Sequence, residues 1–361
     1  MNHRNGAALS LTQDDRSNSS NSSKPNSILN NASSNASMPN TCIRNHLSDQ
    51  TIEQLLECPN TLMVLPYSSG SRQSCAPSQP GAIHSGLTLL GSETALNEVW
   101  TSEKSVIDRG VTGNCYWSKT ESVLAASIWL SPEACQNLEA SSESAYNELL
   151  SLIKDQGYPH PFRFWNYIPD INLGKGDKEH YKLFCTGRLK AFRASDIPDD
   201  QFPSASALGH HAEGAVIYVL AAKVTGRHHN NALQVNAYQY PREYGVSSPS
   251  FSRATCIHLD DQDLFFVSGT ASIIGHKTTC EGDLKGQLET TISNIQHLLE
   301  NKDKSNNQAQ LQSMKVYLRH ASDFIQTQQL LEAAFPETLI VYTLADVCRA
   351  NLLVEVECFC G

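Results

Sequence analysis

An α+β protein with two successive α/β halves is the fold that this sequence predicts, on three observations. Short apolar and aromatic runs alternate with segments whose apolar residues recur at helical spacing. This alternation occurs twice, so mixed sheets covered by helices are expected in both halves. The first 45 residues, rich in serine and asparagine, contain too little apolar surface to offset the entropy of ordering them. We therefore expect a disordered tail at 1–45, an N-terminal half at 46–204 and a C-terminal half at 205–361.

Four segments define the first half. A buried strand is predicted at 123–130, where the residues are almost all apolar. The helix that follows has one apolar stripe and ends before Gly157 and Pro159. A short aromatic strand is predicted at 162–169, and a second helix at 177–193.

The second half is expected to open with the apolar strand 215–222, followed by a strand at 235–240. A strand at 264–268 leads into a turn of small residues, Gly269 to Ser272, where the backbone can approach a ligand closely. The remaining elements alternate: a helix at 283–300, a strand at 314–319, a helix at 322–334, a strand at 339–344 and a terminal strand at 352–358.

Charge and composition exclude several functions. The formal net charge is −10 and no basic stripe is present, so nucleic acid is not an expected partner. No apolar run approaches the roughly 20 residues of a membrane span, and the N-terminus lacks the apolar core of a signal peptide. The eleven cysteines are irregularly spaced without a CxxC pair, which argues against a zinc site. We expect reduced thiols, a cytoplasmic location, and neither a metal nor a membrane partner.

The terminal strand holds the most informative group. Its apolar residues alternate with Leu353, Glu355 and Glu357, which is typical of a strand with unlike faces. A carboxylate in an otherwise apolar chain end is a candidate for a raised pKa, as a general acid near neutral pH requires. The competing interpretation is a solvated strand face that carries two ordinary glutamates.

Two arginines are candidate anion-binding groups. In the second predicted helix, Tyr181, Cys185 and Arg188 share one face. An arginine within an apolar stripe needs an anionic partner, although an internal ion pair or a side chain that reaches solvent would also satisfy it. Arg319 ends a predicted strand, where a guanidinium can hold a carboxylate through two parallel hydrogen bonds.

Several stretches together resemble the chorismatase family, enzymes that hydrolyse chorismate and whose fold is similar to the RidA/YjgF group. The resemblance covers residues 120–357 approximately, and the tail lies outside it. The matching stretches are Arg163–Pro169, Tyr181 with Gly187–Arg188, Ser268–His276 with Gly282–Asp283 and Gln287, Asn294–Ile295, Val316–His320, and Asp346–Arg349 with Leu352–Glu355.

The resemblance implies two RidA/YjgF-like halves and roles for individual residues. Glu355 would be the catalytic acid/base. Substrate would be bound by Tyr181, Arg188, Arg319 and one tyrosine of the pair Tyr238 and Tyr240, of which we prefer Tyr240. Cys348 and Ala271 would lie at positions linked to the choice of product.

The resemblance also implies the reaction. The enolpyruvyl ether of chorismate would be cleaved, without a metal or organic cofactor, to pyruvate and a hydroxybenzoate or a dihydroxycyclohexadiene carboxylate. The alternatives are a RidA-like imine or enamine deaminase and a non-catalytic binding protein of the same fold. Chorismate is the expected partner. The sequence does not distinguish a monomer from a homo-oligomer, nor one ring product from the other.

Overall fold

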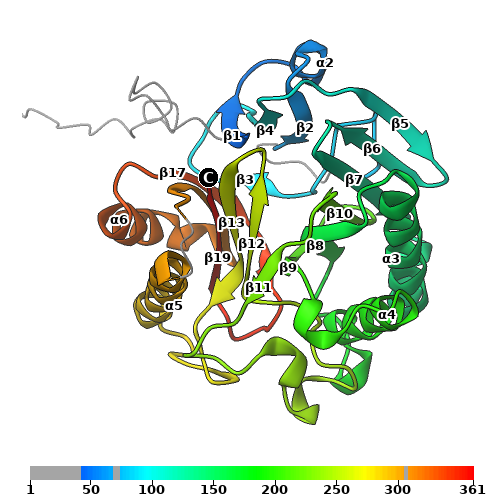
Figure 1. The fold of residues 1–361 in the computed structure, drawn as a ribbon. Coiled ribbons are helices and arrows are strands. Elements are labelled where there is room, and N and C mark those ends of the chain that lie inside the picture. The colour runs from blue at the N-terminus through cyan, green and yellow to red at the C-terminus, as the bar shows by residue number, and fades with distance from the viewer. Residues whose placement is uncertain (1–41, 68–73, 305–307) are drawn as a thin grey trace, which may run out of the picture.

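The computed structural model describes residues 42–67, 74–304 and 308–361. Figure 1 shows two central sheets with helices on their outer sides. Helices α3 (Leu138–Asp155) and α4 (His180–Ala194) cover one sheet. Helices α5 (Leu284–Lys304) and α6 (Phe324–Ala334) cover the other. Most of the expected tail, residues 1–41, lies outside the described residues.

The first sheet has seven strands, and all its neighbours are antiparallel except β8 and β9. The predicted strand at 123–130 and the predicted aromatic strand are confirmed as β7 and β8. In spatial order the strands are β18 (Asp346–Val347), β9 (Ser204–His210), β8 (His160–Pro169), β10 (Ala215–Ala222), β7 (Val123–Leu130), β6 (Cys115–Lys119) and β5 (Asp108–Thr112).

The second sheet also has seven strands, with one parallel pair, β16 and β17. The predicted terminal strand is confirmed as β19, and it pairs with β13 and β16 on its two sides. In spatial order the strands are β11 (Arg227–His229), β12 (Ala254–Leu259), β13 (Gln262–Ala271), β19 (Val354–Cys360), β16 (Leu311–Leu318), β17 (Leu339–Leu344) and β3 (Thr88–Leu89).

The two sheets repeat one topology, although no repeat is visible in the sequence. In each, a hairpin is followed by a helix, a strand, a second helix, a parallel strand and a central antiparallel strand. β10 is the central strand of the first sheet, as β19 is of the second. The expectation that 215–222 opens the second half is therefore wrong, because β10 pairs with β7 and β8.

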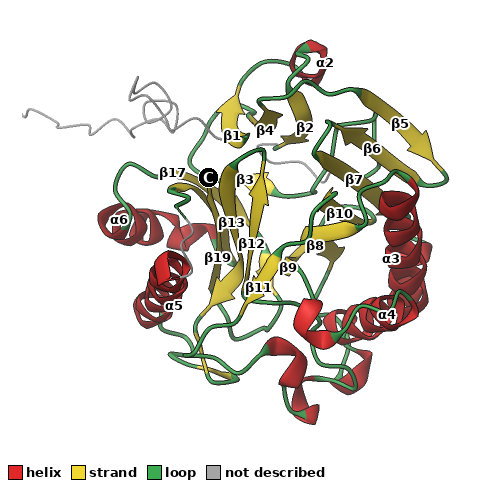
Figure 2. Cartoon of the chain, in the orientation of Figure 1, coloured by secondary structure: helices red, strands yellow, loops and turns green. Residues whose placement is uncertain are grey.

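A third, three-stranded sheet lies at one end of the molecule (Figure 2). It consists of β1 (Ile43–Ser48), β4 (Asn97–Ser102) and β2 (Thr61–Pro66), with the short helix α2 (Ile52–Glu57). None of these elements is predicted by the sequence analysis. β1 also begins within the segment 1–45, which we expected to be disordered throughout.

Alternation along the strands divides the buried residues among three layers. Val216, Tyr218 and Leu220 of β10 pack between the sheets, together with Phe359 of β19. The opposite faces of β10 and β19 pack against the helices of their own sheets. Glu355 and Glu357 share the face of Phe359, since side chains two residues apart in a strand point the same way. Two carboxyl groups are thereby turned towards the interior.

Two predicted local structures are wrong. Segment 235–240 contains a 3-10 turn instead of a strand, because Gln239 and Tyr240 donate backbone hydrogen bonds to Asn236 and Ala237. Gly269 to Ala271 continue β13 and are not a turn, although the pairing with β19 shifts register between Val267 and Thr270. In the described part of the chain, no helix is long and apolar enough to cross a membrane.

Candidate active site

A cavity of about 430 Å³ lies where α4 of the first half meets β13 and β19 of the second. Five of the residues that the sequence analysis singled out line it: Tyr181, Tyr240, Ala271, Cys348 and Glu355. They come from segments up to 174 positions apart, so only the folded chain brings them together. The volume lies within the range of small-molecule sites.

Glu355 is 4% exposed and its carboxyl group faces the cavity. In β19 it lies opposite Ala271 of β13 and Tyr317 of β16. No described residue donates a hydrogen bond to the carboxyl group. Burial raises its pKa to about 8, and the charge of Glu357 adds to this increase, whereas Arg163 and Arg253 oppose it. The side chain is therefore largely protonated at neutral pH, as a general acid must be.

Gly269 leaves the space that the Glu355 carboxyl group fills. A Cβ atom at position 269 would overlap Glu355 Oε1 and crowd Ser206 Oγ. The register shift between β13 and β19 occurs at this glycine. Such bulges bend a strand and redirect side chains, often next to active sites.

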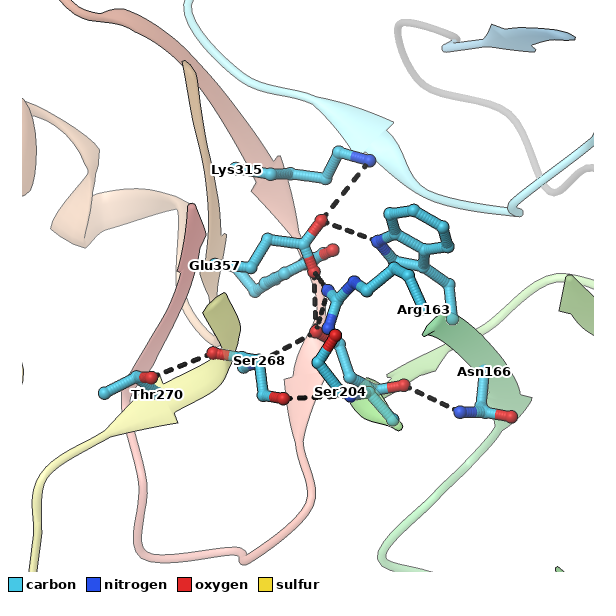
Figure 3. Close-up of polar contacts among 12 residues, drawn as sticks. Arg163, Asn166, Ser204, Ser268, Thr270, Lys315 and Glu357 are labelled. Atoms are coloured by element: carbon cyan, nitrogen blue, oxygen red, sulfur yellow. Dashed lines mark hydrogen bonds and ion pairs between the residues drawn. The ribbon is translucent and has the colours of Figure 1, made fainter. Parts of the chain in front are cut away.

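Glu357 is as deeply buried as Glu355, but its surroundings differ (Figure 3). Arg163 Nη2 and Ser206 Oγ each donate to Glu357 Oε2 at 2.6 Å. Trp165 Nε1 donates to Oε1 at 2.8 Å. Burial alone would raise the pKa of Glu357, yet Arg163, Lys315 and these hydrogen bonds lower it below its usual value. Glu357 is thus an anion, and the interpretation of a solvated face with two ordinary glutamates is wrong.

Tyr181 and Cys348 form one wall of the cavity. Burial raises the pKa of the Tyr181 hydroxyl well above its usual value. Burial, followed by the charge of Glu355, raises the pKa of the Cys348 thiol to about 12. Both groups are therefore neutral proton donors at physiological pH. With Ala271 they also set the shape of the cavity beside Glu355.

Tyr240, not Tyr238, faces the cavity. The Tyr240 hydroxyl accepts a hydrogen bond of 2.6 Å from Arg253 Nη2, which also donates to the carbonyl of Val235 at 3.1 Å. The Tyr238 hydroxyl instead accepts hydrogen bonds from Asn230 and Asn236.

Arg253 and Arg349 also line the cavity, and the sequence analysis assigned neither a role. Arg253 is buried, and among the described residues its Nε and Nη1 have no hydrogen-bond partner. Arg349 lies 4.0 Å from the ring centroid of Tyr244, and its Nη1 donates to the carbonyl of His276 at 3.0 Å. Each arginine is held by one edge and keeps other N–H groups for a ligand.

Arg319 is not among the residues that line the cavity, so the cavity gives no support to the substrate-binding role predicted for it. All five of its N–H groups are used within the protein. Nε donates to the carbonyl of Leu352, Nη1 to the side chains of Asn172 and Asp346, and Nη2 to the carbonyls of Val347 and Arg349. Arg319 therefore fixes the loop that carries Cys348 and Arg349.

Arg188 is likewise absent from the cavity wall. It is 1% exposed and lies against the ring of Phe184, with Nη2 3.9 Å from the sulfur of Cys185. Within the described ranges, no carboxylate lies within 4 Å of its guanidinium. Its charge acts on Tyr181, whose pKa it lowers in opposition to burial. Arg188 thus lies beside the cavity residue Tyr181 but is not itself among the residues that line the cavity.

Two polar residues of α5 hold the backbone around the site. Asn294 Nδ2 donates to the carbonyls of Ala271 and Ile273, at 3.2 and 3.0 Å. Gln287 accepts from the backbone N–H of Leu353 and donates to the carbonyl of Asn351. Both belong to the stretches that carry the resemblance, and their structural role explains why these residue types occur there. Among the described residues, no group of three or more His, Cys, Asp or Glu side chains is arranged to hold a metal ion.

Comparisons with known proteins identify the family of this chain. A family model described as the N-terminal part of FkbO/Hyg5-like chorismatases matches residues 98–221. A 3-hydroxybenzoate synthase of Streptomyces hygroscopicus is 37% identical over 231 residues, which span 60% of this chain and 68% of that protein. A chorismatase of the same organism is 31% identical over 286 residues, which span 76% of this chain and 81% of that protein. A crystal structure of a chorismatase superposes with a TM-score of 0.78 at 25% identity, covering 89% of this chain and 99% of that one. The chain belongs to the chorismatase family.

Proposed function

We propose that the cavity binds chorismate and that Glu355 protonates its enolpyruvyl group, so that pyruvate is released. The observation that carries this proposal is a neutral, buried carboxyl group in a cavity that also contains two arginines with unused N–H groups. Chorismate has two carboxylates and one acid-labile enol ether, which match these groups in number and charge.

Glu355 begins the reaction as an acid. Its proton is transferred to the methylene carbon of the enolpyruvyl group, which leaves an oxocarbenium ion and a Glu355 carboxylate. Water then adds to the cationic carbon and returns one proton to Glu355, which acts as a base in this step. The resulting hemiketal collapses to pyruvate and a ring alcohol. The carboxylate formed in the first step lies near the oxocarbenium ion and stabilises its charge.

Arg253 and Arg349 would each hold one substrate carboxylate. The charged hydrogen bonds that arginine makes with a carboxylate are shorter and stronger than neutral ones. Arg349 is oriented by Tyr244 and His276, and Arg253 by Tyr240. Because these groups are positioned before substrate arrives, little side-chain entropy is lost on binding. Tyr181 and Cys348 complete the wall and exclude water from the ring.

Chorismate turnover tests the proposal directly. Purified protein is incubated with chorismate, without added metal or nucleotide, and pyruvate is measured with a coupled assay. We expect pyruvate and a ring product in equal amounts. A protein that binds chorismate but releases no pyruvate would rule out the reaction, and ammonia release from an enamine substrate would favour the deaminase alternative.

We further propose that the ring product is 3-hydroxybenzoate. The support is the 37% identity to a 3-hydroxybenzoate synthase and the presence of the Cys348 thiol in the cavity wall near Glu355. The ring alcohol formed by the hydrolysis is a dihydroxycyclohexadiene carboxylate, which contains one added water. Loss of its C4 hydroxyl group and C3 hydrogen as water gives 3-hydroxybenzoate, so pyruvate and 3-hydroxybenzoate together contain the atoms of chorismate. Mass spectrometry and NMR of the product distinguish the two outcomes. Replacement of Cys348 by alanine should change their ratio while pyruvate release continues.

A further inference from the structure

Glu357 is the centre of a buried charge network that joins all three sheets. Arg163 comes from β8 of the first sheet, and Lys315 lies opposite Glu357 on β16 of the second. Lys315 Nζ is 3.8 Å from Glu357 and 2.8 Å from Glu98 of the three-stranded sheet. All four charged residues are at most 5% exposed. Figure 3 shows Glu357 between Lys315 and Arg163.

The charges of this network balance without Glu355. Two cations, Arg163 and Lys315, lie among two carboxylates, Glu98 and Glu357. Glu357 accepts hydrogen bonds from Arg163, Ser206 and Trp165, whereas Glu355 accepts none from the described residues. Ionised Glu355 would be a third buried carboxylate in this region, without a donor of its own.

Glu355 and Glu357 are close enough to affect one another. They are two residues apart on one face of β19, a spacing of roughly 7 Å between Cα atoms. Ser206 connects their surroundings, because its hydroxyl donates to Glu357 and lies beside Gly269, against which the Glu355 carboxyl group packs. Two ionised carboxylates at this spacing in a buried site repel each other strongly.

Other ionisable groups face Glu355 from the neighbouring elements. Arg163 of β8 and Arg253, which precedes β12, favour its ionised form, and Glu357 opposes it. Tyr181 of α4 and the Cys348 thiol also interact with it but are neutral. Of these two arginines, Arg253 is the one that lines the cavity. A substrate carboxylate bound to Arg253 would cancel the effect of this arginine on the ionisation of Glu355. The negative charge of Glu357 would then favour the protonated form of Glu355 when the cavity is filled.

We infer that Glu357 is a positioning residue whose fixed negative charge, held by Arg163, keeps Glu355 protonated for proton transfer. This inference rests on the proposed role of Glu355 but concerns a property that exists without substrate. Glu357 itself has no place in the cavity wall and does not touch the reacting atoms. The network thus affects the protonation of Glu355 from outside the cavity, in addition to joining the sheets.

Titration of the Glu355 carboxyl group tests the inference. The protein is prepared with glutamate ¹³C-labelled at the side-chain carboxyl, and the Glu355 signal is assigned by its loss in Glu355→Gln. In Glu357→Gln the titration midpoint should move down by about one pH unit or more, because a like charge is removed and Arg163 is left uncompensated. In Arg163→Gln it should move up, since Lys315, Ser206 and Trp165 still hold Glu357 ionised.

Opposite shifts distinguish an electrostatic role from structural damage. Arg193→Gln is the control, because it makes the same change in charge at an exposed arginine that pairs with Asp199 outside the network, so its midpoint should match the parent's. An unchanged midpoint in folded Glu357→Gln, or a downward shift in Arg163→Gln, would overturn the inference. If Glu357→Gln does not fold, Arg163→Gln decides alone. The titration needs no chorismate, so its outcome is independent of whether the protein turns chorismate over.

Discussion

The strands β10 and β19 occupy the same place in the two repeated sheets, but they present different chemistry to the interior. β10 turns Val216, Tyr218 and Leu220 towards the core between the sheets. β19 turns Glu355, Glu357 and Phe359 in the same direction. Both strands are completely buried. The same position in the topology therefore does not by itself create a site. The difference lies in the side chains on the inner face, which include two glutamates in β19 and none in β10.

The pairing of the two strands differs as well. β10 pairs with β7 in a regular ladder over its whole length, whereas the ladder of β19 with β13 shifts between Val267 and Thr270. Gly269 lies within this irregular stretch and beside the Glu355 carboxyl group, where a larger residue would not fit. Each central strand also has a register shift with its other neighbour, β10 with β8 and β19 with β16, so the shift in the β13–β19 ladder is distinguished by its place beside the cavity.

Replacing Glu355 should have the largest effect on catalysis. Glu355→Gln keeps the shape but removes the transferable proton, so kcat should fall by roughly 10²- to 10⁴-fold while chorismate still binds. In the parent, activity should be retained below pH 8 and lost as the pH rises through about 8, because only the protonated form donates. Steady-state kinetics across pH measure both effects. A variant with near-parental kcat would remove Glu355 from the mechanism.

Filling the space at Gly269 should reduce catalysis, so that β19, like β10, would contribute mainly packing. In Gly269→Ala the new methyl group displaces the Glu355 carboxyl group, and a displacement of about 1 Å is sufficient for a loss of roughly 10²-fold in kcat. Crystallography of the variant should show the carboxyl group moved, and a thermal melt checks that the protein is folded. Full activity would mean that Glu355 tolerates another position.

Removing a cavity arginine should affect binding more than chemistry. Arg349→Ala and Arg253→Ala each remove charged hydrogen bonds worth about 1.5–3 kcal/mol, so KM for chorismate should rise roughly 10- to 100-fold. Arg242→Ala is the matched control, since Arg242 is largely exposed and pairs with Asp177 outside the cavity. An unchanged KM in both cavity variants, as in the control, would refute the carboxylate-binding roles.

The sequence analysis singled out Glu355 but assigned no role to the two arginines that line the cavity with it. Glu355 stands out because alternation along one strand places it among apolar neighbours. Arg349 lies in a loop and Arg253 precedes a short strand, so no local pattern distinguishes them from surface arginines. Arg319 seemed suitable because it ends a strand. Its role became clear only when the folded loop supplied acceptors for all five of its donors.

The fold was predicted unevenly for a similar reason. Helices with a long apolar stripe and the eight-residue apolar strands β7 and β10 were found, since their pattern is local. The elements from β1 to β6 were missed, because these strands are short and several mix polar with apolar residues. The repeat itself was invisible, as β10 and β19 share a place in the sheet without sharing a sequence pattern.

The smallest expected effect is on stability, and it tests the proposed packing role of β10. Tyr218 on β10 stacks on Trp165 with ring centroids 4.6 Å apart, and its hydroxyl lies 3.4 Å from that of Tyr167. Tyr218→Phe keeps the stack and removes one buried hydrogen bond, so the free energy of unfolding should fall by about 0.5–1.5 kcal/mol. Urea denaturation measures this change.

Turnover of chorismate by Tyr218→Phe should equal that of the parent, because the inner face of β10 contributes packing alone. Trp165 also donates to Glu357, so a rearranged stack would disturb the network behind Glu355. A loss of activity with an altered pH profile would therefore show that β10 supports the acid through Trp165. The two central strands would then cooperate, and the division into a packing strand and a chemical strand would have to be abandoned.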